Sequence, residues 1–299
     1  MNLSIIIVSF NVREQLRKNL ESIFNSNVNF GFEVFVVDNN SVDKSVEMIK
    51  KYFPQVRLIE NKNNLGFAKA NNQILKLIKN KYALLLNPDM KLKNDTLQNI
   101  YNWMENNKQV SIAGIKLLGK DGKIIKHVRR FPKFFDQLAI ILKIPHIFPQ
   151  ILNKYILNKF NYTKECQVDS IRGGFFMMNL KNLQKLQKVS VLKNLDNTLP
   201  FLDERYFIWF EEVDFCKQVY VAGGEVWYTP VAECIDYVGQ SFNQVDRKVK
   251  QNYFKDSQLK YFKKWHSIWQ YFVLKIAWVL GKIITNVLEV FHVKGKGKT

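Results

Sequence analysis

Residues 3–11 read LSIIIVSFN, and this apolar run decides the fold. Its β-branched residues favour a strand, which we expect over residues 3–9. Similar runs follow at residues 32–37, 56–59 and 82–86. No basic region precedes the first run and no small-residue cleavage site follows it, so we expect a buried strand rather than a secretory signal.

Helical patterns separate these strands. Apolar residues at helical spacing predict helices over residues 12–24, 45–52 and 68–78. Apolar strands that alternate with helices predict a parallel sheet covered on both faces. The expected fold class is therefore α/β, with a Rossmann-like, mostly parallel sheet flanked by helices. Such sheets bind their ligands at the carboxyl ends of the strands.

Polar side chains gather at these expected carboxyl ends. Each could serve only as a turn or helix-cap residue. Four successive strand ends that are all polar, two with a carboxylate directly after the apolar run, favour a shared binding site instead. In chain order the residues are Ser9, Asn11, Asp38, Asn39, Asn40, Ser41, Asp43, Asn61, Asn63, Asn64, Gly66, Asn87, Pro88 and Asp89.

The composition excludes several classes of protein. Among 299 residues, 47% are hydrophobic and 14% aromatic, which excludes a disordered chain. The three cysteines form no Cys-x-x-Cys pair, and the four histidines share no metal-ligand spacing, so we expect neither a disulfide framework nor a zinc site. The formal charge of +19 indicates an anionic partner, unless it reflects only a Lys-rich genome composition.

Several motifs together resemble family 2 glycosyltransferases, most closely the rhamnosyltransferase-like branch. The resemblance covers about residues 1–265 and rests on the order and spacing of the motifs. It implies a GT-A fold, a nucleotide-sugar donor and inversion at the anomeric carbon. The matching segments read VSFN (8–11), VDNNSVD (37–43), NNLGFAKANN (63–72), LNPD (86–89), RGGFFM (172–177), DERYF (203–207) and FEEVDFC (210–216).

The resemblance implies a nucleotide site and a metal site. The nucleotide site comprises Ser9, Asn11, Asp38, Asn40, Asn64, Gly66 and Asn71. Asn87 and Asp89 stand where the family has its Asp-x-Asp motif, and Asp236 stands where relatives carry a histidine. Oxygen ligands suit Mg²⁺ or Mn²⁺, so we expect a divalent cation held by Asp89, Asn87 and Asp236. A degraded metal site is the alternative.

The FEEVD segment resembles the family motif that carries the catalytic base, which maps to Glu212. We expect Glu211 or Asp214, together with Arg130, Gly173 and Gly174, to contact the acceptor or donor sugar. On a helix, Glu211 and Asp214 share a face and Glu212 points about 100° away. The alternatives are an acidic helix start that only favours the helix dipole, and a solvated Arg130.

Residues 268–291 form an apolar helical pattern with one polar stripe: Lys275, Lys282, Asn286 and Glu289. We expect this amphipathic helix to lie on the cytoplasmic face of a membrane. A core helix or an oligomer interface is the alternative. The expected organisation is a nucleotide-sugar-binding half (1–118), an acceptor-binding and catalytic half of the same domain (119–242), and a C-terminal helical extension (243–299).

The leading hypothesis is an inverting glycosyltransferase of cell-surface polysaccharide synthesis, with dTDP-rhamnose as the candidate donor. We expect a glycan acceptor on a lipid carrier, and peripheral attachment to the inner face of the plasma membrane. A catalytically impaired nucleotide-sugar-binding or scaffold subunit is the alternative. Nucleic-acid binding rests on charge alone, with no recognition motif, so we expect none.

Overall fold

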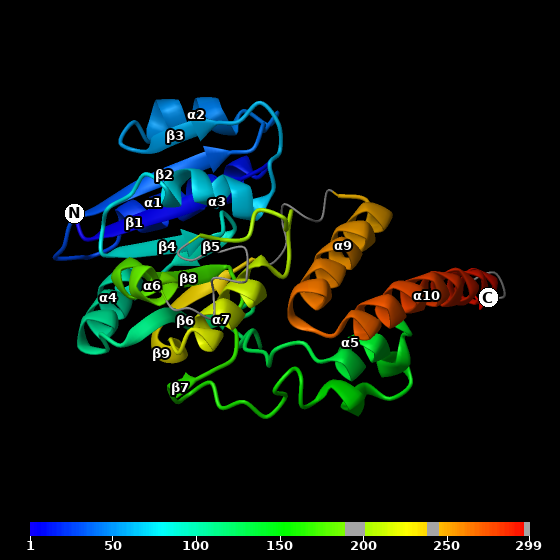
Figure 1. The fold of residues 1–299 in the computed structure, drawn as a ribbon. Coiled ribbons are helices and arrows are strands. Elements are labelled where there is room, and N and C mark those ends of the chain that lie inside the picture. Colours follow the sequence, from blue (N-terminus) through cyan, green and yellow to red (C-terminus); the bar gives the residue numbers. More distant parts are fainter. Residues whose placement is uncertain (189–200, 238–244, 296–299) are drawn as a thin grey trace.

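The computed structural model describes residues 1–188, 201–237 and 245–295, with side chains up to residue 284. Its centre is one sheet with the strand order β3-β2-β1-β4-β8-β6-β9-β5, and β7 also pairs with β9 (Figure 1). The strands are β1 (Leu3–Ser9), β2 (Phe32–Asp38), β3 (Arg57–Glu60), β4 (Tyr82–Leu86), β5 (Met90–Leu92), β6 (Val110–Leu118), β7 (Cys166–Gln167), β8 (Phe175–Asn179) and β9 (Glu225–Asp236).

The strand directions confirm the predicted α/β fold. β3, β2, β1 and β4 run parallel to one another, and Ser9 aligns with Asp38 at the end of the β1–β2 pair. β6 and β9 are also parallel. β8 runs antiparallel between β4 and β6, and β5 and β7 run antiparallel to β9. The carboxyl ends of β1, β2 and β4 therefore meet at one edge, as predicted.

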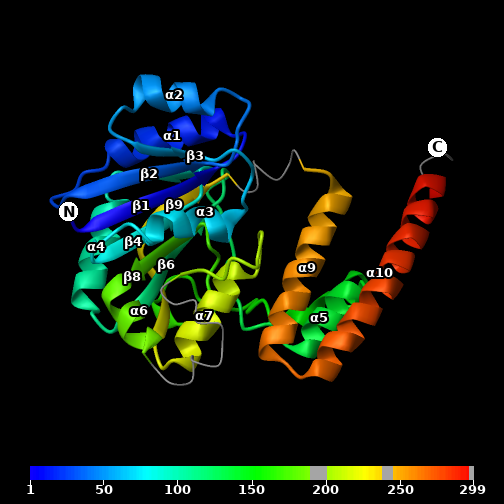
Figure 2. The same cartoon turned by 45° about the horizontal axis from the view of Figure 1, so that its top comes forward.

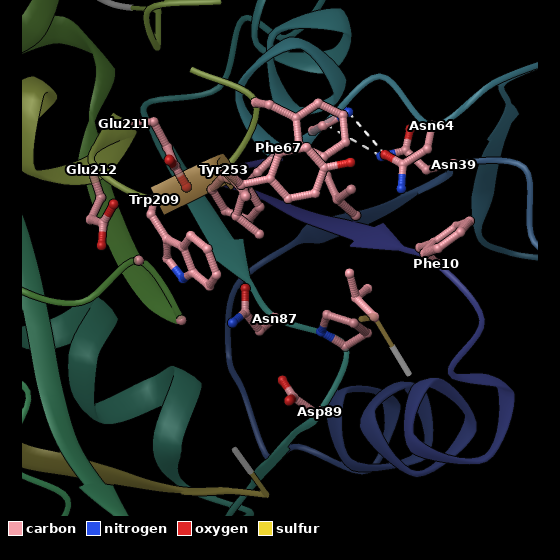
Figure 3. Close-up of a pocket in the computed structure, with 18 of the residues that line it drawn as sticks. Phe10, Asn39, Asn64, Phe67, Asn87, Asp89, Trp209, Glu211, Glu212 and Tyr253 are labelled. Atoms are coloured by element: carbon pink, nitrogen blue, oxygen red, sulfur yellow. Dashed lines mark hydrogen bonds between the residues drawn. The ribbon is translucent and has the colours of Figure 1, made fainter. Parts of the chain in front are cut away.

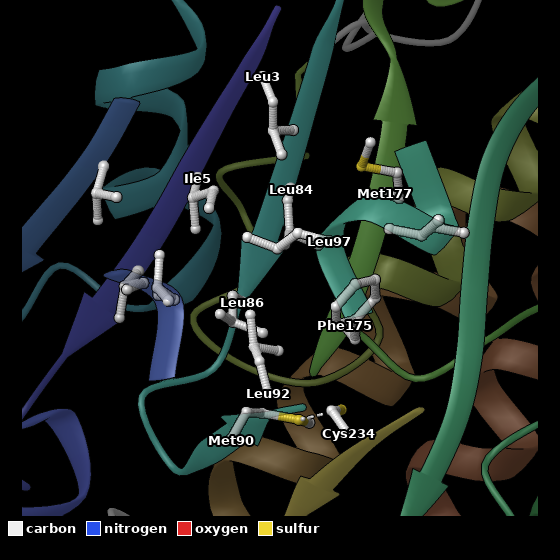
Figure 4. Packing of buried hydrophobic residues seen from close by; sticks show 14 of the residues in the cluster. Leu3, Ile5, Leu84, Leu86, Met90, Leu92, Leu97, Phe175, Met177 and Cys234 are labelled. Carbon is white, nitrogen blue, oxygen red and sulfur yellow. Dashed lines mark hydrogen bonds between the residues drawn. The ribbon is translucent and has the colours of Figure 1, made fainter. Parts of the chain in front are cut away.

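Helices cover both faces of the sheet because two hydrophobic clusters form, one on each side. The first cluster takes side chains from α1 (Arg13–Phe24), α2 (Ser45–Tyr52) and α4 (Thr96–Asn106). Figure 4 shows part of it, from Leu3 and Leu84 to Cys234 beside Met90. The second cluster takes side chains from α3 (Phe67–Leu75), α6 (Leu180–Gln187) and α7 (Glu211–Val221).

A third cluster lies outside the sheet. It joins α5 (Phe134–Ile141), α9 (Arg247–Trp265) and α10 (Ile268–Gly295) with Tyr206 and Phe210 of the segment before α7. Figures 1 and 2 both show α5 beside α10, on the side of the molecule away from the N-terminus. Two short 3-10 helices, η1 (Ile144–His146) and η2 (Pro149–Leu152), follow α5.

The C-terminal helix only partly matches its prediction. Lys275 and Lys282 are exposed as expected, whereas the side chains of Asn286 and Glu289 and the expected boundary at residue 242 lie outside the described parts. α10 also packs internally: a Cβ added to Gly281 would meet the Ile141 carbonyl oxygen of α5 at 2.5 Å. None of the helices described here has the length and apolar character needed to cross a bilayer.

Candidate active site

A cavity of about 540 Å³ opens where β1, β2 and β4 end (Figure 3). Two groups of side chains face each other across it. We call the first the amide wall; it consists of Asn39, Asn64, Gly66, Asn87 and Asp89. We call the second the acid wall; it consists of Arg172, Gly173, Gly174, Trp209, Glu211 and Glu212. The cavity thus brings together predicted residues that lie more than a hundred positions apart in the chain.

Hydrogen bonds hold the side chains of the amide wall in place. Asn39 Nδ2 donates to the Gly66 carbonyl at 3.3 Å, and Asn39 Oδ1 accepts from Asn61 Nδ2 at 2.9 Å. Asn64 Oδ1 accepts from the Gly66 N–H at 3.0 Å. These bonds fix neutral donors and acceptors after β2 and β3, an arrangement that suits a polar, uncharged group such as a ribose or a base.

Gly66 is where the two halves of the chain touch. Its φ of +80° is a conformation that L side chains rarely adopt, and an added Cβ would lie 2.4 Å from the Phe207 carbonyl oxygen. The next residue, Phe67, donates its N–H to the same oxygen at 2.8 Å. Only glycine therefore lets the segment before α3 approach the segment before α7.

The backbone of the two residues that precede α7 is strained. Trp209 and Phe210 have φ values of +64° and +67°, although both are bulky aromatic residues. Such conformations cost free energy and persist where the surrounding structure over-determines them, often at functional sites. They turn the chain so that Glu211 and Glu212, the first residues of α7, reach the cavity, with Trp209 between this pair and Asn87 (Figure 3).

Burial controls the protonation of both glutamates. Burial raises the pKa of Glu212, and the Arg172 charge and backbone hydrogen bonds oppose this only in part. Burial and the neighbouring Glu212 charge raise the pKa of Glu211 well above its ordinary value. One carboxyl oxygen of each, Oε2, has no hydrogen-bond partner among the described residues. The pair therefore combines a candidate base, Glu212, with a neighbouring carboxyl group whose pKa is raised further, so the two favour different protonation states.

Arg172 supplies positive charge to the cavity. Its Nη1 lies 2.8 Å from Asp236 Oδ2, and Asp236 is buried at the end of β9. The backbone places this ion pair next to the amide wall, because the Tyr237 N–H donates to the Asp89 carbonyl at 3.0 Å. Asp236 thus lies beside Asp89, as the metal prediction requires, but its carboxylate is ion-paired to a side chain that lines the cavity.

A metal ion fits part of the predicted ligand set. Asn87 and Asp89 both line the cavity and offer an amide and a carboxylate oxygen, the ligands that hard divalent cations prefer. Within the described parts of the chain, however, no three His, Cys, Asp or Glu side chains cluster around a metal position. The residues present therefore suit a cation that completes its coordination with phosphate and water oxygens.

Five residues predicted for the nucleotide do not line the cavity. Asp38 lies directly behind it: Oδ2 accepts from the Ser41 N–H at 2.8 Å, and Oδ1 is buried without a partner among the described residues. Ser9 is buried below that edge, and Asn40 is exposed. Asn11 Oδ1 accepts from the Val42 N–H, and Asn71 Nδ2 donates to the Phe67 carbonyl.

Two residues predicted to contact sugar also lie elsewhere. Asp214 is fully buried and accepts hydrogen bonds from Lys264 Nζ at 2.8 Å and Trp265 Nε1 at 2.6 Å, so it joins α7 to α9. Asp214 shares a face of the α7 helix with Glu211, which is why both were expected to contact sugar. The cavity, however, is lined only by Glu211 and Glu212 at the start of α7. Arg130 is exposed and is not among the lining residues.

Sequence reasoning missed much of the lining. Asn39 and Arg172 lie inside motifs that the sequence analysis recognised, but neighbouring residues in those motifs were predicted to contact the ligand instead. Trp209 lies two residues after the DERYF segment, and its large aromatic side chain beside a recognised motif could have marked it as a candidate for the site. Tyr253 comes from α9 and stacks on Phe207 with ring centroids 4.5 Å apart. No pattern within α9 indicates that this helix reaches the cavity.

Comparisons with known proteins agree with this geometry. Residues 4–183 match the family model "Glycosyl transferase family 2". The chain is 28% identical over 193 residues to the poly(ribitol-phosphate) beta-N-acetylglucosaminyltransferase TarP of Staphylococcus aureus, covering 60% of this chain and 58% of TarP. It is 24% identical over 242 residues to the rhamnosyltransferase WbbL of Escherichia coli, covering 78% of this chain and 82% of WbbL.

The fold also resembles solved structures. The mannosyltransferase PcManGT from Pyrobaculum calidifontis, solved in complex with GDP-Man and Mn²⁺, superposes with a TM-score of 0.55. The superposition covers 92% of this chain and 68% of PcManGT at 15% sequence identity. At that identity the likeness concerns the fold, and it confirms the predicted GT-A architecture.

Proposed function

The chain belongs to glycosyl transferase family 2 and is a glycosyltransferase, and we propose that it transfers a sugar with inversion from a nucleotide-sugar donor to a glycan hydroxyl. The observation that carries the proposal is the shared cavity. It places the amide wall at the strand ends opposite Glu212, so one opening can hold a nucleotide, a sugar and an attacking hydroxyl.

The nucleotide end of the donor is assigned to the amide wall. Asn39 and Asn64 present fixed amide groups, and Phe10 offers an aromatic face to a base. Asp38 belongs to this proposal through its unpartnered Oδ1, which needs a hydrogen-bond donor such as a ribose hydroxyl or a base N–H.

The diphosphate is assigned to the centre of the cavity, beside Asp89, Asn87 and Arg172. Asp89 and Asn87 would hold the divalent cation, which neutralises diphosphate charge and makes the nucleoside diphosphate a better leaving group. Arg172 adds a guanidinium whose fork matches phosphate oxygens. Asp236 holds Arg172 through their ion pair, and the hydrogen bond from the Tyr237 N–H to the Asp89 carbonyl keeps the end of β9 beside Asp89.

Glu212 is assigned as the general base. Its carboxylate accepts the proton of the acceptor hydroxyl while the hydroxyl oxygen attacks the anomeric carbon. The bond between that carbon and the diphosphate oxygen breaks on the opposite face, and the nucleoside diphosphate leaves with the bonding electrons. Glu211, kept protonated by burial and by the neighbouring charge, donates a hydrogen bond to a sugar hydroxyl.

The acceptor and the donor sugar are proposed from the relatives. TarP by name acts on poly(ribitol phosphate), and WbbL by name is a rhamnosyltransferase. We therefore propose a lipid-carried cell-surface polymer as the acceptor, rhamnose from dTDP-rhamnose as the first donor to test, and a location at the inner face of the plasma membrane. Because the match covers only 58% of TarP, these assignments remain proposals for this chain.

A donor screen tests the proposal. The full chain is incubated with UDP-, GDP- and dTDP-sugars, each with Mg²⁺, Mn²⁺ or a chelator, and release of the nucleoside diphosphate and binding of the free nucleotides are measured. We expect one nucleotide class both to bind and to be released, with loss of release in chelator. Binding without any release would favour the impaired-subunit alternative. Neither binding nor release from any donor would overturn the proposal.

A further inference from the structure

The outer face of α10 is apolar and uncovered. The helix packs inward through Leu274, Ala277 and Gly281, all of them buried against α5 and α9. At about 100° per residue, the opposite side carries Trp269, Phe272, Ile276, Val279, Leu280 and Ile283. These six side chains are between 50% and 63% exposed, and we call them the docking face.

The docking face is continuous and has the size of an interfacial helix. Its six side chains lie within about 100° of the helix circumference and span about 21 Å along the axis. Phe134 extends it onto α5, because its ring contacts both Trp269 and Phe135, with centroids 5.0 and 5.1 Å apart. Phe135 is itself 78% exposed, so an apolar strip crosses from one helix to the next.

Positive charge borders this strip on α10. Lys275 and Lys282, both exposed, lie on one flank of the docking face, and Lys263 precedes the helix. Residues 268–284 contain no Asp or Glu. Two copies of this helix pressed face to face would therefore bring their lysines together without a counter-charge. An apolar strip edged by lysines instead complements lipid tails beneath anionic headgroups.

We propose that the docking face binds the surface of an anionic lipid bilayer, with α10 lying in the plane of the membrane. Its apolar side chains enter the boundary between headgroups and acyl chains, Trp269 sits at the level of the headgroups, and the two lysines pair with lipid phosphates. Membrane binding follows from the exposure and charge of these side chains, and its link to a lipid-carried acceptor rests on the proposed function.

The structure also connects the docking face to the acid wall. Trp278 Nε1 of α10 donates to Gln258 Oε1 of α9 at 2.7 Å. The residue before Gln258, Ser257, donates its Oγ hydroxyl to the carbonyl of Ile208 at 2.8 Å, and Ile208 directly precedes Trp209. Lys264 and Trp265 of α9 hold Asp214 of α7. A bilayer that holds α10 would therefore also hold the segment that carries Glu211 and Glu212.

Vesicle co-sedimentation tests the proposal without any activity measurement, so its failure is distinguishable from failure of the proposed transfer. The full chain is mixed with vesicles of phosphatidylcholine alone, or of phosphatidylcholine with one third phosphatidylglycerol. We expect strong binding to the anionic vesicles and weaker binding to the neutral ones, and 1 M NaCl should lower the binding to anionic vesicles to about the neutral level, because salt screens the lysines but not the apolar contact. A chain that stays in the supernatant with both kinds of vesicle overturns the proposal.

Three variants localise the interaction. Phe272→Asp with Ile276→Asp should lower the partition coefficient at least tenfold, and Lys275→Glu with Lys282→Glu should do so on anionic vesicles only. Leu77→Asp is the matched control, since Leu77 is 65% exposed but lies after α3, outside the docking face. Equal binding by all variants overturns the proposal. If the chain forms a dimer in lipid-free solution, Phe272→Asp with Ile276→Asp dissociates that dimer, and no vesicle binding occurs, the docking face is an interface with a second copy and the proposal is overturned.

Discussion

The amide wall carries three asparagines and the carboxylate of Asp89, with Asn39 and Asn64 held at Gly66 by hydrogen bonds, whereas the acid wall carries two buried carboxyl groups with raised pKa values and a guanidinium. The amide wall follows directly from the ends of β2, β3 and β4. The acid wall depends on two distant loops, one before β8 and one before α7. This difference suggests a division of work, in which the amide wall recognises the donor and the acid wall moves the proton.

The sharpest test of that division is Glu212→Gln. It removes the proposed base with little change in shape, so kcat for transfer should fall about 10²- to 10⁴-fold while the donor KM changes little. Glu211→Gln is the matched control, because an amide mimics the protonated acid that burial maintains there. We expect it to keep kcat within about tenfold. Equal losses in both variants, or undiminished transfer in Glu212→Gln, would end the assignment of the base.

Lys264→Met tests the support behind the acid wall. The buried Lys264 ammonium lies 2.8 Å from Asp214 and 3.0 Å from Asp203. Burial alone would raise the pKa of Asp203, but Arg205 and Lys264 outweigh it and lower that pKa to about 2. Arg205 still pairs with Asp203, but removing Lys264 leaves the buried Asp214 carboxylate without its ion-pair partner, which costs about 3–5 kcal/mol. Tm should fall by on the order of 10 °C, as measured by calorimetry.

The control for that variant is Lys263→Met, which changes an exposed neighbour and should leave Tm nearly unchanged. Adding Asp214→Asn to Lys264→Met removes the carboxylate that lost its counter-charge, so it should recover part of the lost stability. If Lys264→Met melts like the wild type, the ion cluster does not hold α7 against α9, and the acid wall must be positioned by apolar packing alone.

The difference between the walls also explains what the sequence could predict. The bounds of β1, α2 and β4 matched because apolar runs and helical spacing are local signals. Glu212 and the glycines at 173 and 174 came from motif order, and all three line the cavity. Trp209, Tyr253 and the pairing of Arg172 with Asp236 were not predicted, since each depends on segments brought together only by the tertiary fold.

Gly66→Ala tests how the walls are joined. Alanine at φ +80° is strained, and its Cβ would also meet the Phe207 carbonyl oxygen at 2.4 Å. Gly223→Ala isolates the first effect, because Gly223 has φ +81° with no atom within 4 Å of an added Cβ. We expect a strain cost of about 1–2 kcal/mol in both variants. Only Gly66→Ala should raise the donor KM, by about tenfold. A similar KM in the two variants would contradict the close approach.

The smallest expected effects concern the pH dependence of the two glutamates of the acid wall. Because burial raises the pKa of Glu212, kcat should fall tenfold per pH unit on an acid limb that lies above the ordinary glutamate range. A carboxyl whose folded pKa exceeds its unfolded value stabilises the fold at low pH, and this contribution is lost as pH rises through the folded pKa. Glu211→Gln should therefore raise Tm at pH 8 more than at pH 5, as followed by thermal melts. A Tm gain in Glu211→Gln that is the same at pH 5 and pH 8 would contradict the raised pKa of Glu211.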